Sequence, residues 1–290
     1  DPNNVIIFGD QSLAKGYTLE FNEMWGSDGP EPNAANSRFG ALKTVNTPKR
    51  FIIGGSSVEL YFSPTDGTTS AIEQAIQSTD YDLSFAVLAF TRNDLGAAVI
   101  EAGASIFINP QGAIEDVNST GSEYDALLDA GIAVYSHTGI SGQLHHKYGI
   151  IDQSEPLSDP TVVTGSHNWS TTAETTNDEN TVVVHDARVA NLYFQEFSGL
   201  LNAMGVGIHE AGEDQPLCLV FPNPATSTIT LQLTELASMG DWIRLLDGQG
   251  RLVLTEQIMG TSTRLEIGHL TAGIYLMQYG NSQPAQLVIQ

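Results

Sequence analysis

The chain has 290 residues and carries 34 acidic against 11 basic side chains, a formal net charge of −23. This balance argues against broad, charge-driven binding to DNA or anionic membranes, because such binding is built from many Lys and Arg contacts to phosphate. No apolar run approaches the roughly 20 residues of a membrane-spanning helix, and the single cysteine, Cys218, excludes an intrachain disulfide. The length predicts two or three domains.

The first residues resemble a segment near position 190. A β-type run, VIIF (5–8), precedes an amphipathic helix pattern at 10–21, and the same order recurs at 181–185 and 186–197. Asp, a branched aliphatic residue, Ala, Tyr, Glu and Phe coincide at a constant offset of 176. We interpret this as an internal duplication in which residues 1–25 are the tail of a first unit, cut off before residue 1. A chance match of one helix signature is the alternative.

Residues 26–55 are rich in Gly, Pro, Asn and Ser, which predicts the connection between the two units. From residue 56 to 206, strand and helix patterns alternate along the chain. The expected strands are 57–62, 83–90, 105–109, 132–137, 161–165 and 181–185, and the expected helices are 69–78, 93–102, 123–130 and 186–197. This alternation predicts a layered α/β fold around a mainly buried sheet.

The character of the chain changes after residues 207–216, which are expected to form a linker. Residues 217–290 consist of strand-like runs separated by turns, and DGQG (247–250) between two such runs is a strong hairpin signal. We expect a small all-β sandwich here, of the immunoglobulin-like kind.

The stretch QLHHKYGIID carries the first cluster of reactive side chains. Side chains at i and i+2 of a strand point to the same face, so His145 and Lys147 project together while His146 points the other way. Imidazole can attack as a neutral nucleophile or donate a proton. A lysine adds a compact positive charge for a phosphate oxygen, and its charge disfavours imidazolium, which keeps His145 neutral. The pair therefore suits phosphoryl chemistry.

Further polar residues follow downstream. Asp152 has the opposite parity to His145, so it is expected to orient a group or balance charge rather than meet the substrate. GSHNWS (165–170) follows a strand directly, and a Gly-Ser turn there lets the backbone and the Ser166 hydroxyl approach an anion, to which Asn168 adds amide donors. Glu179 places a carboxylate before the next strand.

Together these residues resemble the signature of the phospholipase D superfamily. The matching positions are His145, Lys147, Asp152, Gly165, Ser166, Asn168 and Glu179. The resemblance covers residues 56–206 as a second catalytic repeat and implies a phospholipase D-like α/β fold. It also implies a phosphohistidine mechanism without metal or cofactor.

The resemblance also implies a role for each matching residue. His145 would act as nucleophile or as general acid/base. Lys147, Ser166 and Asn168 would hold the phosphate. Asp152 and Glu179 would orient histidines.

The sequence departs from this pattern in two ways. The His-x-Lys pair of a first repeat is absent, and Asn3 stands where the duplication places the counterpart of Glu179. The chain is therefore expected to hold half an active site and to be weak or inactive alone. The missing half would come from an upstream repeat or from a second chain.

The C-terminal part resembles the sorting domain of the bacterial type IX secretion system. The resemblance rests on Pro222-Asn223-Pro224, the Asp247-Gly248 turn and the run Leu270-Thr271-Ala272-Gly273-Ile274-Tyr275. It implies export across the outer membrane of a Bacteroidota-type cell by the type IX machinery, followed by release or anchoring at the surface. An immunoglobulin-like spacer or adhesion module is the alternative.

These features predict a secreted phosphodiesterase of the phospholipase D superfamily. Residues 1–214 carry 29 acidic and 8 basic residues, which favours a phospholipid or a small diester over polymeric DNA. A non-specific endonuclease of the same superfamily and a degenerate, non-catalytic surface-binding protein are the alternatives. The sequence leaves hydrolysis and transfer undistinguished.

Overall fold

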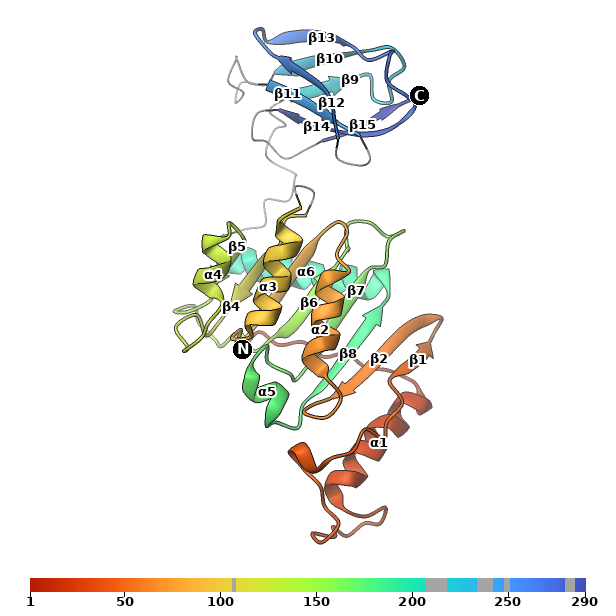
Figure 1. Ribbon diagram of the computed structural model, residues 1–290, viewed down its shortest axis with the longest axis vertical. Helices are drawn as coiled ribbons and strands as arrows, with labels where there is room; N and C mark the ends of the chain where they lie inside the picture. Colours follow the sequence, from red (N-terminus) through yellow and green to blue (C-terminus); the bar gives the residue numbers. More distant parts are fainter. Residues whose placement is uncertain (106–107, 207–217, 234–241, 248–250, 280–284) are drawn as a thin grey trace. The chain divides into compact units, whose positions relative to one another are not determined.

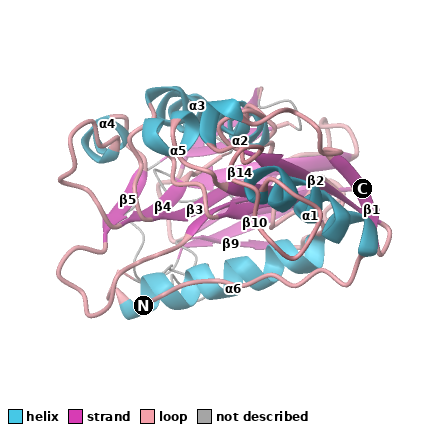
Figure 2. Cartoon of the chain, turned by 90° about the horizontal axis from the view of Figure 1, so that it is seen from below, coloured by secondary structure: helices cyan, strands magenta, loops and turns pink. Residues whose placement is uncertain are grey.

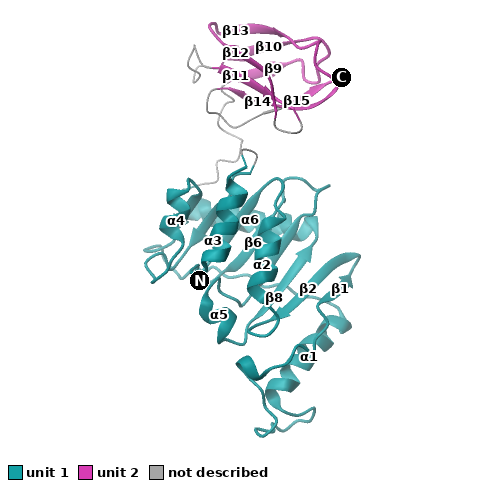
Figure 3. Cartoon of the chain, viewed as in Figure 1, with its two compact units in different colours: residues 1–208 teal, residues 209–290 magenta. Residues whose placement is uncertain are grey.

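In the computed structural model the chain divides into two compact units, residues 1–208 and 209–290 (Figures 1 and 3). The structure describes residues 1–105, 108–206, 218–233, 242–247, 251–279 and 285–290. The predicted linker at 207–216 lies outside the described residues. Within the described ranges, no helix combines the length and the apolar character needed to cross a membrane.

An eight-stranded mixed sheet forms the centre of the first unit. Its strands are β1 (Arg50–Ile53), β2 (Ser56–Phe62), β3 (Leu83–Val87), β4 (Gln111–Ile114), β5 (Ala133–Ser136), β6 (Lys147–Ile151), β7 (Thr161–Gly165) and β8 (Asn180–His185). They are arranged in the order β1-β2-β8-β7-β6-β3-β4-β5. The pairs β3–β4 and β4–β5 are parallel and all the others are antiparallel. This order places the ends of β6, β7 and β8 next to one another.

Helices cover both faces of this sheet (Figure 2). They are α1 (Gln11–Trp25), α2 (Thr68–Gln77), α3 (Asn93–Gly103), α4 (Tyr124–Asp129), α5 (Thr171–Thr175) and α6 (Ala187–Ala203). The apolar faces of α2 and α3 pack with β3 and with Val163 and Val183. On the opposite face α6 packs over Tyr148 and Ile150 of β6. Alternate residues of the central strands therefore enter different cores, as the period of two requires.

The layered α/β fold is confirmed, with three local differences. Residues 5–8 form no strand in the described chain, so that prediction is wrong; Val5 and Ile7 are exposed. The strand expected at 105–109 is found instead at β4, and residues 106–107 lie outside the described chain. β1 lies within the segment expected to be a connection, where it pairs with β2.

The two segments related by the offset of 176 make equivalent contacts. Asp10 caps α1 by accepting a hydrogen bond from the Leu13 amide, and Asp186 caps α6 by accepting one from the amide of Val189. Such side-chain caps satisfy the free amides of a first helical turn.

Two further bonds in these segments are reciprocal. Tyr17 donates to Asn180 Oδ1 at 3.1 Å, and Asn4 Nδ2 donates to the Tyr193 hydroxyl at 2.9 Å. Residues 4 and 17 correspond to 180 and 193 at the same offset. Exchange of equivalent partners is the pattern of an approximate two-fold axis.

The second unit is all-β, as predicted. One sheet contains β9 (Cys218–Phe221), β10 (Thr228–Leu233) and β13 (Ser262–Glu266), and the other contains β11 (Trp242–Leu246), β12 (Leu252–Gln257), β14 (Gly273–Tyr279) and β15 (Ala285–Ile289). Residues of both sheets share one apolar core. β11 and β12 pair as the expected hairpin, although residues 248–250 of its turn lie outside the described chain. The immunoglobulin-like assignment stays a prediction.

Candidate active site

A cavity of about 600 Å³ opens where β6 and β8 begin and β7 ends. Its other wall is the amino-terminal segment and the first turns of α1. The lining includes every predicted phosphate-binding residue, together with His145 and Glu179. The polar lining residues are Asn3, Asn4, Asp10, Tyr17, His145, Lys147, Thr164, Ser166, Asn168, Glu179 and Asn180.

The parity predicted for the His-His-Lys stretch is present in the fold. Lys147 Nζ lies 3.4 Å from His145 Nδ1 and donates to the His145 carbonyl oxygen at 2.8 Å. The His145 side chain is exposed to the cavity, whereas Lys147 is buried. His146 is fully buried on the other side of the strand, next to Tyr148.

The site shifts the pKa of both functional groups in the same direction. Burial lowers the pKa of Lys147 to about 8, although the charges of Glu179 and Asp116 act against this. The positive charge of Lys147 is the main cause that lowers the pKa of His145, followed by burial and by the charge of His146. His145 is therefore held in its neutral form at neutral pH, as a nucleophile or a general base requires.

The turn after β7 depends on a glycine. Gly165 has φ +152°, and a Cβ there would lie 2.1 Å from the carbonyl oxygen of Asn180. The close approach lets the Ser166 amide donate to that oxygen at 3.0 Å, while Ser166 Oγ accepts from the Asn180 amide at 3.1 Å. The amide of Asn168 lies in the cavity wall, and its Oδ1 is buried without a partner among the described residues. The turn thus leaves the hydrogen-bonding capacity of this oxygen unused.

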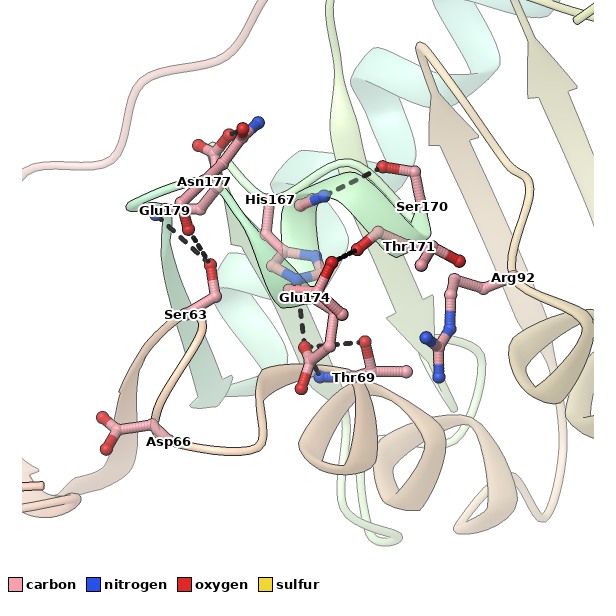
Figure 4. A network of polar contacts seen from close by, with 12 residues as sticks. Ser63, Asp66, Thr69, Arg92, His167, Ser170, Thr171, Glu174, Asn177 and Glu179 are labelled. Carbon is pink, nitrogen blue, oxygen red and sulfur yellow. Dashed lines mark hydrogen bonds and ion pairs between the residues drawn. The ribbon is translucent and has the colours of Figure 1, made fainter. Parts of the chain in front are cut away.

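His167 anchors this turn from behind (Figure 4). Its buried ring contacts Glu174 of α5 at 3.3 Å, and the same carboxylate accepts from the amide and the hydroxyl of Thr69 in α2. Burial raises the pKa of Glu174, but the hydrogen bonds from His167 and Thr69 outweigh it and leave that pKa below its ordinary value. The sequence did not predict this network. His167 lies between two phosphate-binding candidates, and nothing in the local spacing indicates a contact with α2.

Glu179 is positioned by the loop around it. Its amide donates to Ser63 Oγ at 3.3 Å, and Asn177 Nδ2 donates to its carboxylate at 3.0 Å (Figure 4). The adjacent Asp178 pairs with Lys43 at 3.0 Å, and the buried Lys43 also pairs with Glu20 of α1. The connection between the duplicated segments therefore holds the loop that carries Glu179. Glu179 lines the same cavity as Lys147, and its negative charge acts to raise the pKa of Lys147.

The predicted role of Asp152 is wrong. Asp152 lies beyond the far end of β6, and its buried carboxylate accepts from the backbone amides of Asp80, Tyr81 and Asp82 at 2.8–3.4 Å and from Ser158. His146 and the five residues of β6 separate it from His145, which corresponds to about 23 Å along an extended chain. Asp152 therefore fixes the turn before β3, and among the described residues its carboxylate contacts no histidine.

Two family models match parts of the chain. Residues 72–201 match the family described as "Cardiolipin synthase, PLD-like domain". The chain contains a phospholipase D-like domain. Residues 219–290 match the "Secretion system C-terminal sorting domain". This domain indicates export by the type IX secretion system to the cell surface or beyond it.

The chain spans about a third of the length of one curated relative that it matches and little more than half of another. The chain is similar to a mitochondrial cardiolipin hydrolase of Xenopus tropicalis, with 38% identity over 28% of this chain and 36% of that protein. It is 29% identical to the Mus musculus protein of the same name, over 46% of this chain and 58% of that protein. A phospholipase D family member of Salmonella typhimurium, Nuc, aligns structurally with a TM-score of 0.44 and 24% identity, covering 51% of this chain and 95% of Nuc.

Proposed function

We propose that the protein is an exported phosphodiesterase in which His145 and Lys147 act on one phosphodiester. The observation that supports this most directly is that a neutral histidine and a buried lysine share one cavity with Ser166 and Asn168. The phospholipase D-like domain suggests the reaction class, because the relatives named above are hydrolases.

In the proposed reaction the neutral ring of one histidine attacks phosphorus. A P–N bond forms, the P–O bond to the leaving group breaks, and a second acid protonates the leaving oxygen. Water then attacks the phosphohistidine and releases the histidine and the phosphate product. His145 takes either the nucleophile's or the acid/base role. The ammonium of Lys147 and the amide of Asn168 stabilise the negative charge that develops on the non-bridging oxygens.

We propose a phospholipid or a small diester as the substrate. Two curated relatives are named cardiolipin hydrolases, and cardiolipin is itself a lipid phosphodiester. The net charge of −23 opposes polymeric nucleic acid, whose binding requires release of counterions by many cationic side chains. Export places the enzyme where lipid from other cells is available.

We further propose that a second half-site carrying its own His–Lys pair completes the cavity. The reciprocal contacts of Asn4 with Tyr193 and of Tyr17 with Asn180 support an approximate two-fold axis through this cavity. The second half-site would belong to another part of the same protein or to a second copy. Specific activity that rises with protein concentration, in step with a dimer seen by sedimentation, would identify the second copy.

Product assays on bis(4-nitrophenyl) phosphate, cardiolipin, phosphatidylcholine and plasmid DNA test the proposal. We expect turnover of the aryl diester and of a phospholipid by protein in which both half-sites are present, and a loss of at least about a hundredfold in His145→Ala. His269→Ala, which removes an exposed histidine of the other unit, is the matched control and should match the unchanged protein. Cleavage of DNA without cleavage of any phospholipid would contradict the lipid substrate and support the endonuclease alternative. Full activity in His145→Ala would refute the proposed chemistry.

A further inference from the structure

The ring of His146 has two acceptors and no exposure to water. Its Nδ1 lies 3.0 Å from Asn4 Oδ1, and its Nε2 lies 2.9 Å from Glu196 Oε1 of α6. The side chain is fully buried. Each ring nitrogen is thus within hydrogen-bond distance of an oxygen that can accept.

The amide of Asn4 has two further contacts. Its Nδ2 donates to Thr164 Oγ1 and to the Tyr193 hydroxyl, both at 2.9 Å. In this orientation its oxygen faces His146, and an amide oxygen has no proton to donate. The Nδ1 of His146 then carries the proton of that bond.

The hydrogen bonds of Glu196 favour its ionised form. Its second oxygen accepts a hydrogen bond from the hydroxyl of Tyr148. Burial raises the pKa of Glu196, but the hydrogen bonds from His146 and Tyr148 outweigh it and leave that pKa below its ordinary value. An ionised carboxylate accepts only, so the Nε2 of His146 also has to carry a proton.

We infer that His146 is a buried imidazolium, paired with Glu196, which adds a second fixed positive charge directly behind His145. A neutral ring would leave one nitrogen lone pair facing an acceptor oxygen in a fully buried site, which is unfavourable. Because His146 is the chain neighbour of His145, its charge acts with that of Lys147 to disfavour a proton on His145. This role rests on the proposed function of His145.

The duplicated segment offers a comparison. Glu20 stands at the position of Glu196 in the first copy, and its partner is the ammonium of Lys43. Both related carboxylates therefore accept from a buried nitrogen group on the inner side of their helix. A lysine supplies the cation in one copy, and His146 supplies it in the other.

The groups that face His146 are few and come from three segments. They are Asn4 from the amino-terminal segment, Glu196 from α6, and Tyr148, Lys147 and His145 from the same strand region. Lys147 and His145 point to the cavity instead. Among the residues the structure describes, Glu196 is therefore the one acidic group in contact with this ring.

Nitrogen NMR of the ring tests the charge without any substrate. In the full chain labelled at histidine, two-bond ¹H–¹⁵N spectra at pH 7.5 should show protons on both nitrogens of His146, assigned by the signal that His146→Gln removes. Tyr148→Phe is the matched control, because it removes the other hydrogen bond of Glu196 and should leave both protons in place. Glu196→Gln should convert the ring to a neutral form. A ring with one bare nitrogen in the unchanged protein would overturn the inference.

The consequence for His145 is tested by pH profiles of kcat/KM on bis(4-nitrophenyl) phosphate. Without the charge of His146, the pKa of His145 should rise, so the acid limb of His146→Gln should move to higher pH by about half a unit. Tyr148→Phe should keep the limb in place. An unmoved limb in His146→Gln would refute the electrostatic role. If no diester is turned over at all, the proposed function fails, while the NMR result still decides the state of His146.

Discussion

Replacing Lys147 by Met should make the protein more stable while abolishing its activity. Burial lowers the pKa of Lys147 from 10.5 to about 8, and each pKa unit corresponds to about 1.4 kcal/mol. The charged lysine thus costs the folded state about 3 kcal/mol at neutral pH. Loss of its bond to the His145 carbonyl offsets about 1–2 kcal/mol of this. A net gain of about 1–2 kcal/mol is expected, because Met fills a similar volume.

The sign of the pH dependence makes this prediction specific. Between the folded pKa of about 8 and the unfolded value of 10.5, the unfolded chain binds more protons at this lysine, so the original protein gains stability as pH rises. The advantage of Lys147→Met should therefore shrink by about 2 kcal/mol between pH 7 and pH 9.5.

Urea unfolding of the two proteins at both pH values measures the difference, and turnover of bis(4-nitrophenyl) phosphate measures the activity. Lys15→Met, which removes an exposed lysine of α1, is the control and should change stability little at either pH. A Lys147→Met protein that is less stable at pH 7, or a difference that does not depend on pH, would refute the reasoning.

Three further outcomes follow from the fold. Asp152→Asn should lower the free energy of unfolding by about 1–3 kcal/mol, since the carboxylate accepts from several buried amides, but should keep most of its turnover at a temperature where it stays folded; a selective loss of kcat would restore a catalytic role. Gly165→Ala should lose both stability and activity, because its Cβ would meet the Asn180 carbonyl at 2.1 Å; near-normal urea unfolding would contradict this. The pKa of Asp186 is lowered to about 2, mainly by its hydrogen bond with Ser56. The ionised carboxylate therefore stabilises the fold above about pH 4, and this stabilisation is lost as pH falls toward 2. Asp186→Asn should make the stability depend less on pH between 4 and 2, and an unchanged midpoint of acid unfolding would contradict this.

Local patterns in the sequence were sufficient where the geometry repeats along the chain. The period of two put His145 and Lys147 on one side of the strand and His146 on the other, and helical spacing located α2, α3 and α6 within a few residues. The same rule gave Asp152 the opposite parity. It could not show that the carboxylate meets the turn at residues 80–82, because that contact joins segments about 70 residues apart.

The run at 5–8 shows where local propensity fails. Its residues are β-branched and aromatic, but a strand exists only when a neighbour supplies the ladder of hydrogen bonds. No such ladder forms there in the described chain, although Ile6 and Phe8 pack into the core beside α1. The duplication predicted that α1 and α6 are equivalent helices. It did not predict whether the segment before α1 pairs with a neighbouring strand.

The sequence by itself determined the layered class, the sorting domain and the identity of the polar residues around the cavity, because these follow from periodicity and from motifs of fixed spacing. Tertiary structure decided which of those residues act together. It removed Asp152 from the site, placed His167 and Lys43 behind the turns that carry Asn168 and Glu179, and gave His146 acceptors from two distant segments. Such roles depend on burial and on partners far apart in the chain, and neither is encoded in local spacing.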